Sequence, residues 1–318
     1  MIIRFSSLGD IVIATSVYNA IKKKYPESKV SFLTKSKFSP ILEGLDFEEI
    51  ITIKSSSFKE LFKIRKKIKD EKFDYIIDLH CNQRSFIFRL FNSKNILKTD
   101  KRNIQRRLLV KSKIKDKKTS SIIDDHFSEL GELGLERDVL PILKIDPDAA
   151  KFALEKDIDR DSLVIHPGAK WELKKWGLEK FRELAKMLSD RFNPVFIGDR
   201  KCSPPDDFEF PIIRDTSLDQ LKGILANSGL FIGNDSGPVH IAAALGTPSI
   251  AIFGPTHPAL GFAPKGIKTS VIQNNLECSP CTLHGNAKCK LNSSYQARCM
   301  LELSPDYVYR KVLEFLEG

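Results

Sequence analysis

The chain has 318 residues, of which 42% are hydrophobic and 29% are charged, a composition typical of a globular protein long enough for two domains. No run approaches the roughly 18–20 apolar residues of a membrane-spanning helix, and the N-terminal MIIRF enters a strand without a signal-peptide pattern. These features argue against an integral membrane protein and a secreted one, and we expect a cytoplasmic location.

The net charge of +10 is confined to the first half of the chain. Residues 1–156 hold 32 Lys and Arg against 22 Asp and Glu, whereas residues 157–318 hold 19 of each. The segment 98–118 alone carries ten basic and two acidic residues. It is either a solvated face or a surface for an anionic partner such as acidic lipid headgroups or a phosphorylated glycolipid. Nucleic acid is disfavoured, because no aromatics or recognition motif accompany the basic residues.

The first half alternates expected strands with expected helices. Such alternation indicates βαβ units and a parallel sheet, and therefore an α/β protein. We expect strands at 1–5, 30–33, 50–53 and 75–79, and helices at 11–24, 40–44, 58–69, 85–91 and 122–134.

A segment with scattered charge and two prolines, 138–148, reads as a linker, after which the alternation restarts. The pattern predicts two doubly wound, Rossmann-like domains, 1–156 and 157–318, which face a central cleft and bind ligands at the carboxyl ends of their strands. We also consider that the terminal helix packs back on the first domain. The second half is expected to have strands at 162–165, 194–197, 212–213, 230–232 and 249–253, and helices at 178–191, 218–226, 237–245 and 305–316.

The segment LFIGNDSGPVHIAAALGTPSIAIFGP, residues 230–255, reads as strand, turn, helix, turn and strand. A helix that begins just after the carboxyl end of a parallel strand offers free N–H groups and the positive end of its dipole, which suit a phosphate. Asp235, Ser236, Gly237 and His240 lie at this turn. Because an acid, a small cap and an imidazole fall within six residues, we favour a site for a nucleotide sugar over a merely structural helix.

Two further turns carry candidate residues. Asp10, after the first strand, is either a helix-capping acid or a general base that takes the proton from an attacking hydroxyl. His166, Gly168 and Ala169 form the matching turn of the second half, where Gly168 allows close backbone approach to a ligand. Lys174 is either a surface lysine beside a packed tryptophan or a cation that neutralises a leaving diphosphate.

Other ligand motifs are weak. The chain has no G-x-G fingerprint and no P-loop, which argues against a dehydrogenase, and the D-x-D matches at 146–148, 157–159 and 159–161 read as solvated linker charges rather than metal ligands. Late in the chain four cysteines cluster, and their first pair has C-x-x-C spacing. A structural zinc site and packed free thiols are both open for them, whereas disulfides are disfavoured in a cytoplasmic chain. The four are Cys278, Cys281, Cys289 and Cys299.

Together these motifs resemble glycosyltransferase family 9, the heptosyltransferases of lipopolysaccharide core synthesis. The resemblance rests on IIRFSSLGDIVIATSVYNAIKKKYP, VIHPGAKWELKKWGLEKFRELA, GNDSGPVHIAAALGTPSIAIFGPTHP and CSPC with the later Cys-Met pair. It implies a GT-B fold with an N-terminal acceptor domain and a C-terminal nucleotide-sugar domain. It also implies an inverting transfer of heptose from ADP-heptose to the inner core, without a cofactor or a catalytic metal.

The resemblance also implies roles for the candidate residues. Asp10 would be the base that activates the acceptor hydroxyl, and Lys174, two residues before the tryptophan, would balance the diphosphate. The basic first half would meet an anionic glycolipid at the inner face of the cytoplasmic membrane. The donor would be bound by Asp235, Ser236, Gly237 and His240, with His166, Gly168 and Ala169 also lining its site.

Three alternatives remain open. One is a family relative that uses another nucleotide sugar for a different surface glycan. Another is a nucleotide-sugar epimerase of GT-B fold, which needs no acceptor and gives no reason for a basic acceptor face. The last is a non-catalytic binding protein, against which the presence of both Asp10 and Lys174 argues.

Overall fold

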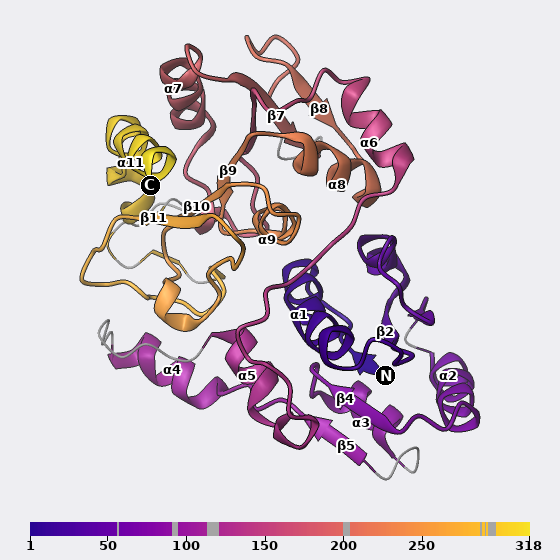
Figure 1. Ribbon diagram of the computed structural model, residues 1–318. Helices are drawn as coiled ribbons and strands as arrows, with labels where there is room; N and C mark the ends of the chain where they lie inside the picture. The colour runs from indigo at the N-terminus through magenta and orange to yellow at the C-terminus, as the bar shows by residue number, and fades with distance from the viewer. Residues whose placement is uncertain are drawn as a thin grey trace. The chain divides into compact units, whose positions relative to one another are not determined.

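The structure is a computed structural model that describes residues 1–55, 57–90, 95–112, 121–199, 204–286, 288–289, 291 and 297–318. It contains two compact units, each built on one parallel sheet (Figure 1). Unit 1 comprises Met1–Arg102 and Ile122–Lys144, and unit 2 comprises Asn103–Ser121 and Ile145–Gly318. The predicted α/β class is therefore confirmed.

The sheet of unit 1 has five strands in the order β3-β2-β1-β4-β5. The central strand β1 consists of two fully buried isoleucines, which pair with β2 on one side and β4 on the other. Because β1 and β4 lie next to each other while the chain runs outward on both sides, the strand order reverses between them. The elements of unit 1 are β1 Ile2–Ile3, α1 Leu8–Lys24, β2 Ser31–Lys35, β3 Glu49–Ile53, α2 Phe58–Asp70, β4 Tyr75–Asp78, α3 Gln83–Arg89, β5 Asn95–Lys98 and α5 Ile122–Ser128.

The sheet of unit 2 has six parallel strands in the order β11-β10-β9-β6-β7-β8, which is the strand order of a Rossmann fold. The strands β9 and β10 are buried along their whole length, as expected for a parallel sheet covered on both faces. The strand order reverses between β6 and β9. The elements are α4 Asn103–Ser112, α6 Pro147–Leu154, β6 Ser162–His166, α7 Leu178–Leu188, β7 Asn193–Gly198, β8 Ile212–Arg214, α8 Leu218–Asn227, β9 Leu230–Asn234, α9 Gly237–Ala244, β10 Ser249–Phe253, β11 Thr269–Gln273, α10 Arg298–Glu302 and α11 Pro305–Glu317.

The compact units differ from the expected domains 1–156 and 157–318 in two places. The expected linker 138–148 leads into helix α6, whose N-cap Asp146 accepts a hydrogen bond from the Ala149 N–H at 2.7 Å. Helix α6 packs against α8 in unit 2. The two helices are so close that a Cβ on Gly223 of α8 would lie 1.9 Å from the carbonyl oxygen of Ala149 in α6. Helix α4 also belongs to unit 2.

The sequence patterns did not predict β5, β11, α4 or α6. The strands β5 and β11 lie at sheet edges, and their partly exposed residues form no apolar run. At the C-terminus, α11 packs against α7 and β11 within unit 2. Within the described part of the chain, no helix combines the length and the apolar character needed to cross a bilayer.

Candidate active site

The carboxyl ends of β6 and β9 lie side by side where the strand order of unit 2 reverses, the usual place for a ligand in such a sheet. Asn234, the last residue of β9, is fully buried there. Its amide nitrogen donates to the Pro167 carbonyl at 2.7 Å, and its amide oxygen accepts from the Trp176 N–H at 3.0 Å. One side chain thus fixes the 166–169 turn and the start of α7 relative to β9.

The carboxylate of Asp235 lies at the centre of the polar cluster. The Lys174 ammonium donates to Asp235 Oδ2 at 2.6 Å, and the Thr256 hydroxyl donates to the same oxygen at 2.7 Å. The side chains of Lys174 and Asp235 are only 14% and 8% exposed, so their attraction is less screened than that of a surface pair. The neighbouring Lys175 instead pairs with Glu172 at 2.7 Å. The structure therefore places Lys174, and not Lys175, on the predicted donor ligand Asp235.

The N-terminus of α9 lies beside this pair. Its N-cap is Ser236, whose side chain forms no capping hydrogen bond; the hydroxyl oxygen lies 3.5 Å from His166 Nδ1. Gly237 is the first residue of the helix, and His240 is buried within it. Burial lowers the pKa of His166 to about 4, so its imidazole is neutral at pH 7 and presents one N–H and one lone pair.

The loop that contains Gly285, which is distant in the sequence, packs against the Lys174 side chain. Gly285 has a φ of +87°, and a Cβ at this position would lie 2.8 Å from Lys174 Cγ and 2.9 Å from Lys174 Cε. The backbone of Gly285 therefore packs directly on the lysine stem, and its N–H donates to Thr282 Oγ1 at 3.2 Å. This contact limits where the Lys174 ammonium can point.

The cysteines of the expected cluster lie in and after the loop that contains Gly285. Cys278, Cys281, Cys289 and Cys299 form no disulfide among the described residues, and within the same residues no group of three or more His, Cys, Asp or Glu side chains could hold a metal ion. Burial, followed by the nearby sulfurs of Cys281 and Cys278, raises the pKa of Cys299 to about 12. Cys299 is therefore a buried, protonated thiol at neutral pH.

Asp10, the expected base, lies near the start of α1 in unit 1. Arg4 Nη2 lies 2.8 Å from Asp10 Oδ1, and the Ser7 N–H and hydroxyl both donate to Oδ2 at 2.7 Å. Burial alone would raise the pKa of Asp10, but the charge of Arg4 and the bonds from Ser7 outweigh it and lower the pKa to about 2. The carboxylate is therefore ionised and held in one orientation at neutral pH.

The basic segment 98–118 is not a uniform solvated face; its residues 113–118 lie outside the described part of the chain. Arg106 is only 3% exposed, and its Nε donates to the Leu260 carbonyl at 2.8 Å. Arg102 Nε lies 3.4 Å from the Asp125 carboxylate. Part of the segment is thus structural, and among its described residues the exposed cations are Lys98, Arg107 and Lys111.

Sequence reasoning missed four residues of these clusters. Arg4, Asn234 and Thr256 each lie at the end of a strand or within three residues after it, the position from which they could have been found. Gly285 gave no local signal, because its role depends on contact with Lys174, which is far away in the sequence.

Comparison with known proteins identifies relatives of the chain. The family model described as "Glycosyltransferase family 9 (heptosyltransferase)" matches residues 61–291. Lipopolysaccharide heptosyltransferase 3 of Escherichia coli is 25% identical over 279 residues, which cover 78% of this chain and 81% of that protein. Lipooligosaccharide heptosyltransferase 2 of Campylobacter jejuni subsp. jejuni serotype O:2 is 26% identical, with 98% of this chain and 96% of that protein covered.

Solved structures share the fold of the whole chain. The structure of E. coli ADP-heptose lps heptosyltransferase II matches with a TM-score of 0.74 and 20% identity, covering 99% of this chain and 98% of that one. The glycosyl transferase family 9 protein from Veillonella parvula matches with a TM-score of 0.76 and 20% identity, covering 100% and 97%. These matches confirm the predicted GT-B fold.

Proposed function

The chain belongs to glycosyltransferase family 9, and we propose that it transfers heptose from ADP-heptose to the inner core of lipopolysaccharide, on an acceptor of Kdo-bearing or heptose-bearing lipid A. The observation that carries the proposal is the buried pair of Lys174 and Asp235 at the N-terminus of α9. This arrangement offers a cation and free helix N–H groups to a diphosphate, where the strand order of unit 2 reverses.

The donor is proposed to bind in unit 2. The N–H groups at the start of α9 suit the diphosphate, and the Asp235 carboxylate suits donor hydroxyls, while Ser236, Gly237 and His240 line the same turn with the 166–169 loop. Among the similar structures, E. coli heptosyltransferase WaaC carries ADP in one and ADP-2-deoxy-2-fluoro heptose in another. This likeness supports an ADP-sugar as the donor here.

In the proposed reaction, the acceptor hydroxyl loses its proton to the Asp10 carboxylate, and its oxygen forms a bond to the anomeric carbon of heptose. The bond from that carbon to the diphosphate breaks, and ADP leaves with the electron pair. Lys174 stabilises the charge that grows on the leaving group. Attack from the face opposite the leaving group inverts the anomeric configuration.

The low pKa of Asp10 has a mechanistic consequence. A carboxylate with a pKa of about 2 is a weak base toward a free hydroxyl. The proton is therefore expected to move late, after the bond between the oxygen and the anomeric carbon has begun to form and the hydroxyl has become acidic. Arg4 and Ser7 keep Asp10 ionised and oriented for that moment.

We also propose peripheral association with the anionic inner face of the cytoplasmic membrane. On α2 of unit 1, Phe58 and Phe62 lie one turn apart and are 75% and 56% exposed, and Lys59, Lys63 and Lys66 are exposed around them. Exposed aromatics surrounded by lysines suit the interface of an anionic bilayer.

Vesicle sedimentation tests this location. The wild type is expected to sediment with anionic vesicles and not with neutral ones, and the double variant Phe58→Ser, Phe62→Ser should lose most of that binding. Leu154→Ser, at a residue of unit 2 that is 64% exposed, is the control and should bind as the wild type does. Equal binding of the double variant would refute the assignment of this surface.

The function itself is tested by ADP release from ADP-heptose with and without a Kdo-lipid A acceptor. Release that depends on the acceptor supports the proposal. Epimerisation of the donor without an acceptor would instead support the epimerase, and no turnover with any nucleotide sugar would support a binding protein. Turnover only with another nucleotide sugar would identify a family relative of different donor specificity.

A further inference from the structure

We propose that the carboxyl edge of the sheet in unit 1 holds a subsite for an oxyanion of the acceptor, formed by Lys35, His80 and Lys101 beside Asp10. The proposal rests on the proposed function and deepens it, because it names the acceptor group that is recognised next to the base. The group is a carboxylate or a phosphate, and the experiment below separates the two.

The strand order brings these residues to one edge. Lys35 is the last residue of β2, and Arg4 directly follows β1. His80 comes two residues after β4, and Lys101 three residues after β5. Because β2, β1, β4 and β5 are parallel neighbours, all four basic side chains start from the same edge of the sheet. Arg4 and His80 flank the point where the strand order reverses, where such sheets bind ligands.

Positive charge exceeds negative charge at this edge. Arg4 pairs with Asp10 at 2.8 Å, whereas within the described residues the Lys35 ammonium makes no hydrogen bond or ion pair. Burial, followed by the charges of Arg4 and Lys101, lowers the pKa of His80 to about 3, against the opposite effect of Asp10, and Lys35 adds to the lowering. Burial and the charge of Arg4 likewise lower the pKa of Lys101. An oxyanion placed among these groups would relieve their mutual repulsion.

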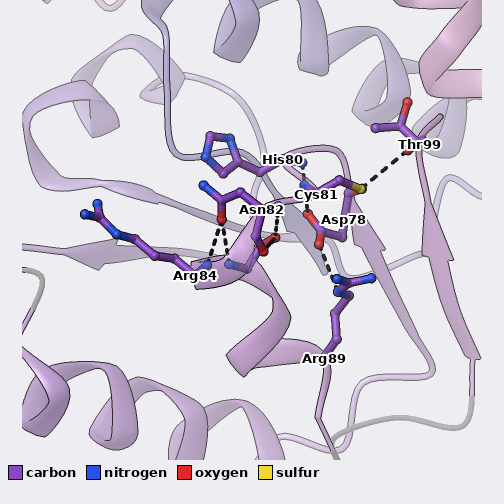
Figure 2. Close-up of polar contacts among 8 residues, drawn as sticks. Asp78, His80, Cys81, Asn82, Arg84, Arg89 and Thr99 are labelled. Atoms are coloured by element: carbon purple, nitrogen blue, oxygen red, sulfur yellow. Dashed lines mark hydrogen bonds and ion pairs between the residues drawn. The ribbon is translucent and has the colours of Figure 1, made fainter. Parts of the chain in front are cut away.

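The turn after β4 fixes the position of His80. The Asp78 carboxylate accepts from the His80 N–H at 2.9 Å and from the Cys81 N–H at 2.8 Å, and Arg89 balances its charge at 3.1 Å. In Figure 2 the Arg89 side chain reaches Asp78 from the end of α3, and the His80 ring lies away from this pair. The ring packs on Phe5 with centroids 4.6 Å apart.

His80 also carries an unmet polar group. Within the described residues its Nδ1 is buried and has no hydrogen-bond partner. A buried nitrogen without a partner is unfavourable, and such groups gather at functional sites. At neutral pH the low pKa keeps the imidazole uncharged, so His80 offers a hydrogen bond while the lysines supply the charge.

The acceptor, rather than the donor, suits this subsite. The donor diphosphate is assigned to Lys174 and the start of α9 in unit 2, whereas Lys35, His80 and Lys101 belong to unit 1 with Asp10. An anionic group bound beside the base would fix the reacting hydroxyl relative to the Asp10 carboxylate.

The test compares Lys35→Ala, Lys101→Ala and the double variant with Lys29→Ala. Lys29 precedes β2, at the amino end of the same strand that ends at Lys35, so the control removes an equal charge from the opposite edge. We expect each subsite variant to raise the acceptor KM about tenfold, the loss of one charge-assisted hydrogen bond, with the donor KM and melting temperature unchanged. Lys29→Ala should behave as the wild type. An acceptor KM in the double variant within twofold of wild type would overturn the proposal.

Two modified acceptors identify the oxyanion. If it is a sugar carboxylate, converting that carboxyl to an amide should remove the difference in KM between wild type and double variant, and removing the lipid phosphates should leave it. The reverse result identifies a phosphate, and a difference that survives both changes would refute an anionic ligand.

The subsite can be tested even if heptosyl transfer is not observed. Calorimetric binding of the free acceptor sugar acid and of inorganic phosphate to the wild type, Lys29→Ala and the double variant needs no turnover. Binding lost only in the double variant supports the subsite, and equal binding by all three proteins contradicts it.

Discussion

Replacing Asp235 by Asn tests whether this carboxylate acts by holding Lys174. The variant keeps the side-chain shape and an oxygen that can accept from Thr256, but it removes the charge that binds the Lys174 ammonium at 2.6 Å. A hydrogen bond to a charged group contributes about 1.5–3 kcal/mol, and about 1.4 kcal/mol corresponds to tenfold. We therefore expect kcat/KM for ADP-heptose to fall about 10- to 150-fold.

The assay is a double-mutant cycle at saturating acceptor, with Asp235→Asn, Lys174→Met and both together. Once Lys174 is replaced, the change at Asp235 should cost less than it does alone, because only its contact with donor hydroxyls is left, so the two losses should not fully multiply. Thermal unfolding of each variant checks that the fold is kept. Losses that multiply fully would show that Asp235 does not act by holding Lys174, and an Asp235→Asn enzyme of wild-type activity would refute any role of the carboxylate.

Three further residues give separate predictions. Gly285→Ala should lower kcat/KM about tenfold by displacing Lys174. The control Gly246→Ala is also at positive φ, but its added Cβ would lie 3.7 Å from the nearest atom, so it should lower stability only. Equal kinetics for the two variants would contradict the contact between Gly285 and Lys174. Asn234→Ala should destabilise unit 2 in urea by about 1–3 kcal/mol for each partner left unpaired, and an unchanged midpoint would remove its structural role. The pKa of His166 is about 4 in the folded chain, against the usual 6.5 when unfolded. Because the unfolded chain therefore binds the extra proton first, the free energy of unfolding should fall by about 3 kcal/mol as the pH falls from 6.5 to 4. His166→Gln should lose less over the same range.

The sequence analysis predicted most buried strands and the candidate residues that follow them at the carboxyl edge of each sheet. Asp10, His166 and Asp235 were found because buried apolar runs end just before them, and a parallel sheet collects such positions at one edge. The same runs predicted most strands of both sheets. Local pattern is sufficient there, because burial on both faces of a strand leaves a continuous apolar signal.

Features that depend on contacts between distant segments were not predicted. The link between Gly285 and Lys174, and the packing of α6 on Gly223, exist only after the chain has folded. Helix α6 did carry a local signal, since Asp146 and Pro147 are a good N-cap and first residue. The scattered charge around these two residues nevertheless led to the interpretation of 138–148 as a linker. The edge strands β5 and β11 were missed because half-exposed strands lack the apolar run.

The central claim is heptosyl transfer with Asp10 as the base, and the mass of the acceptor tests it most directly. Incubation of Kdo-lipid A with ADP-heptose and the wild type should add one heptosyl residue to the acceptor. Asp10→Asn should add none while binding ADP-heptose with nearly unchanged affinity. Transfer by Asp10→Asn at most of the wild-type rate, or a wild type that leaves the acceptor mass unchanged, would contradict the account.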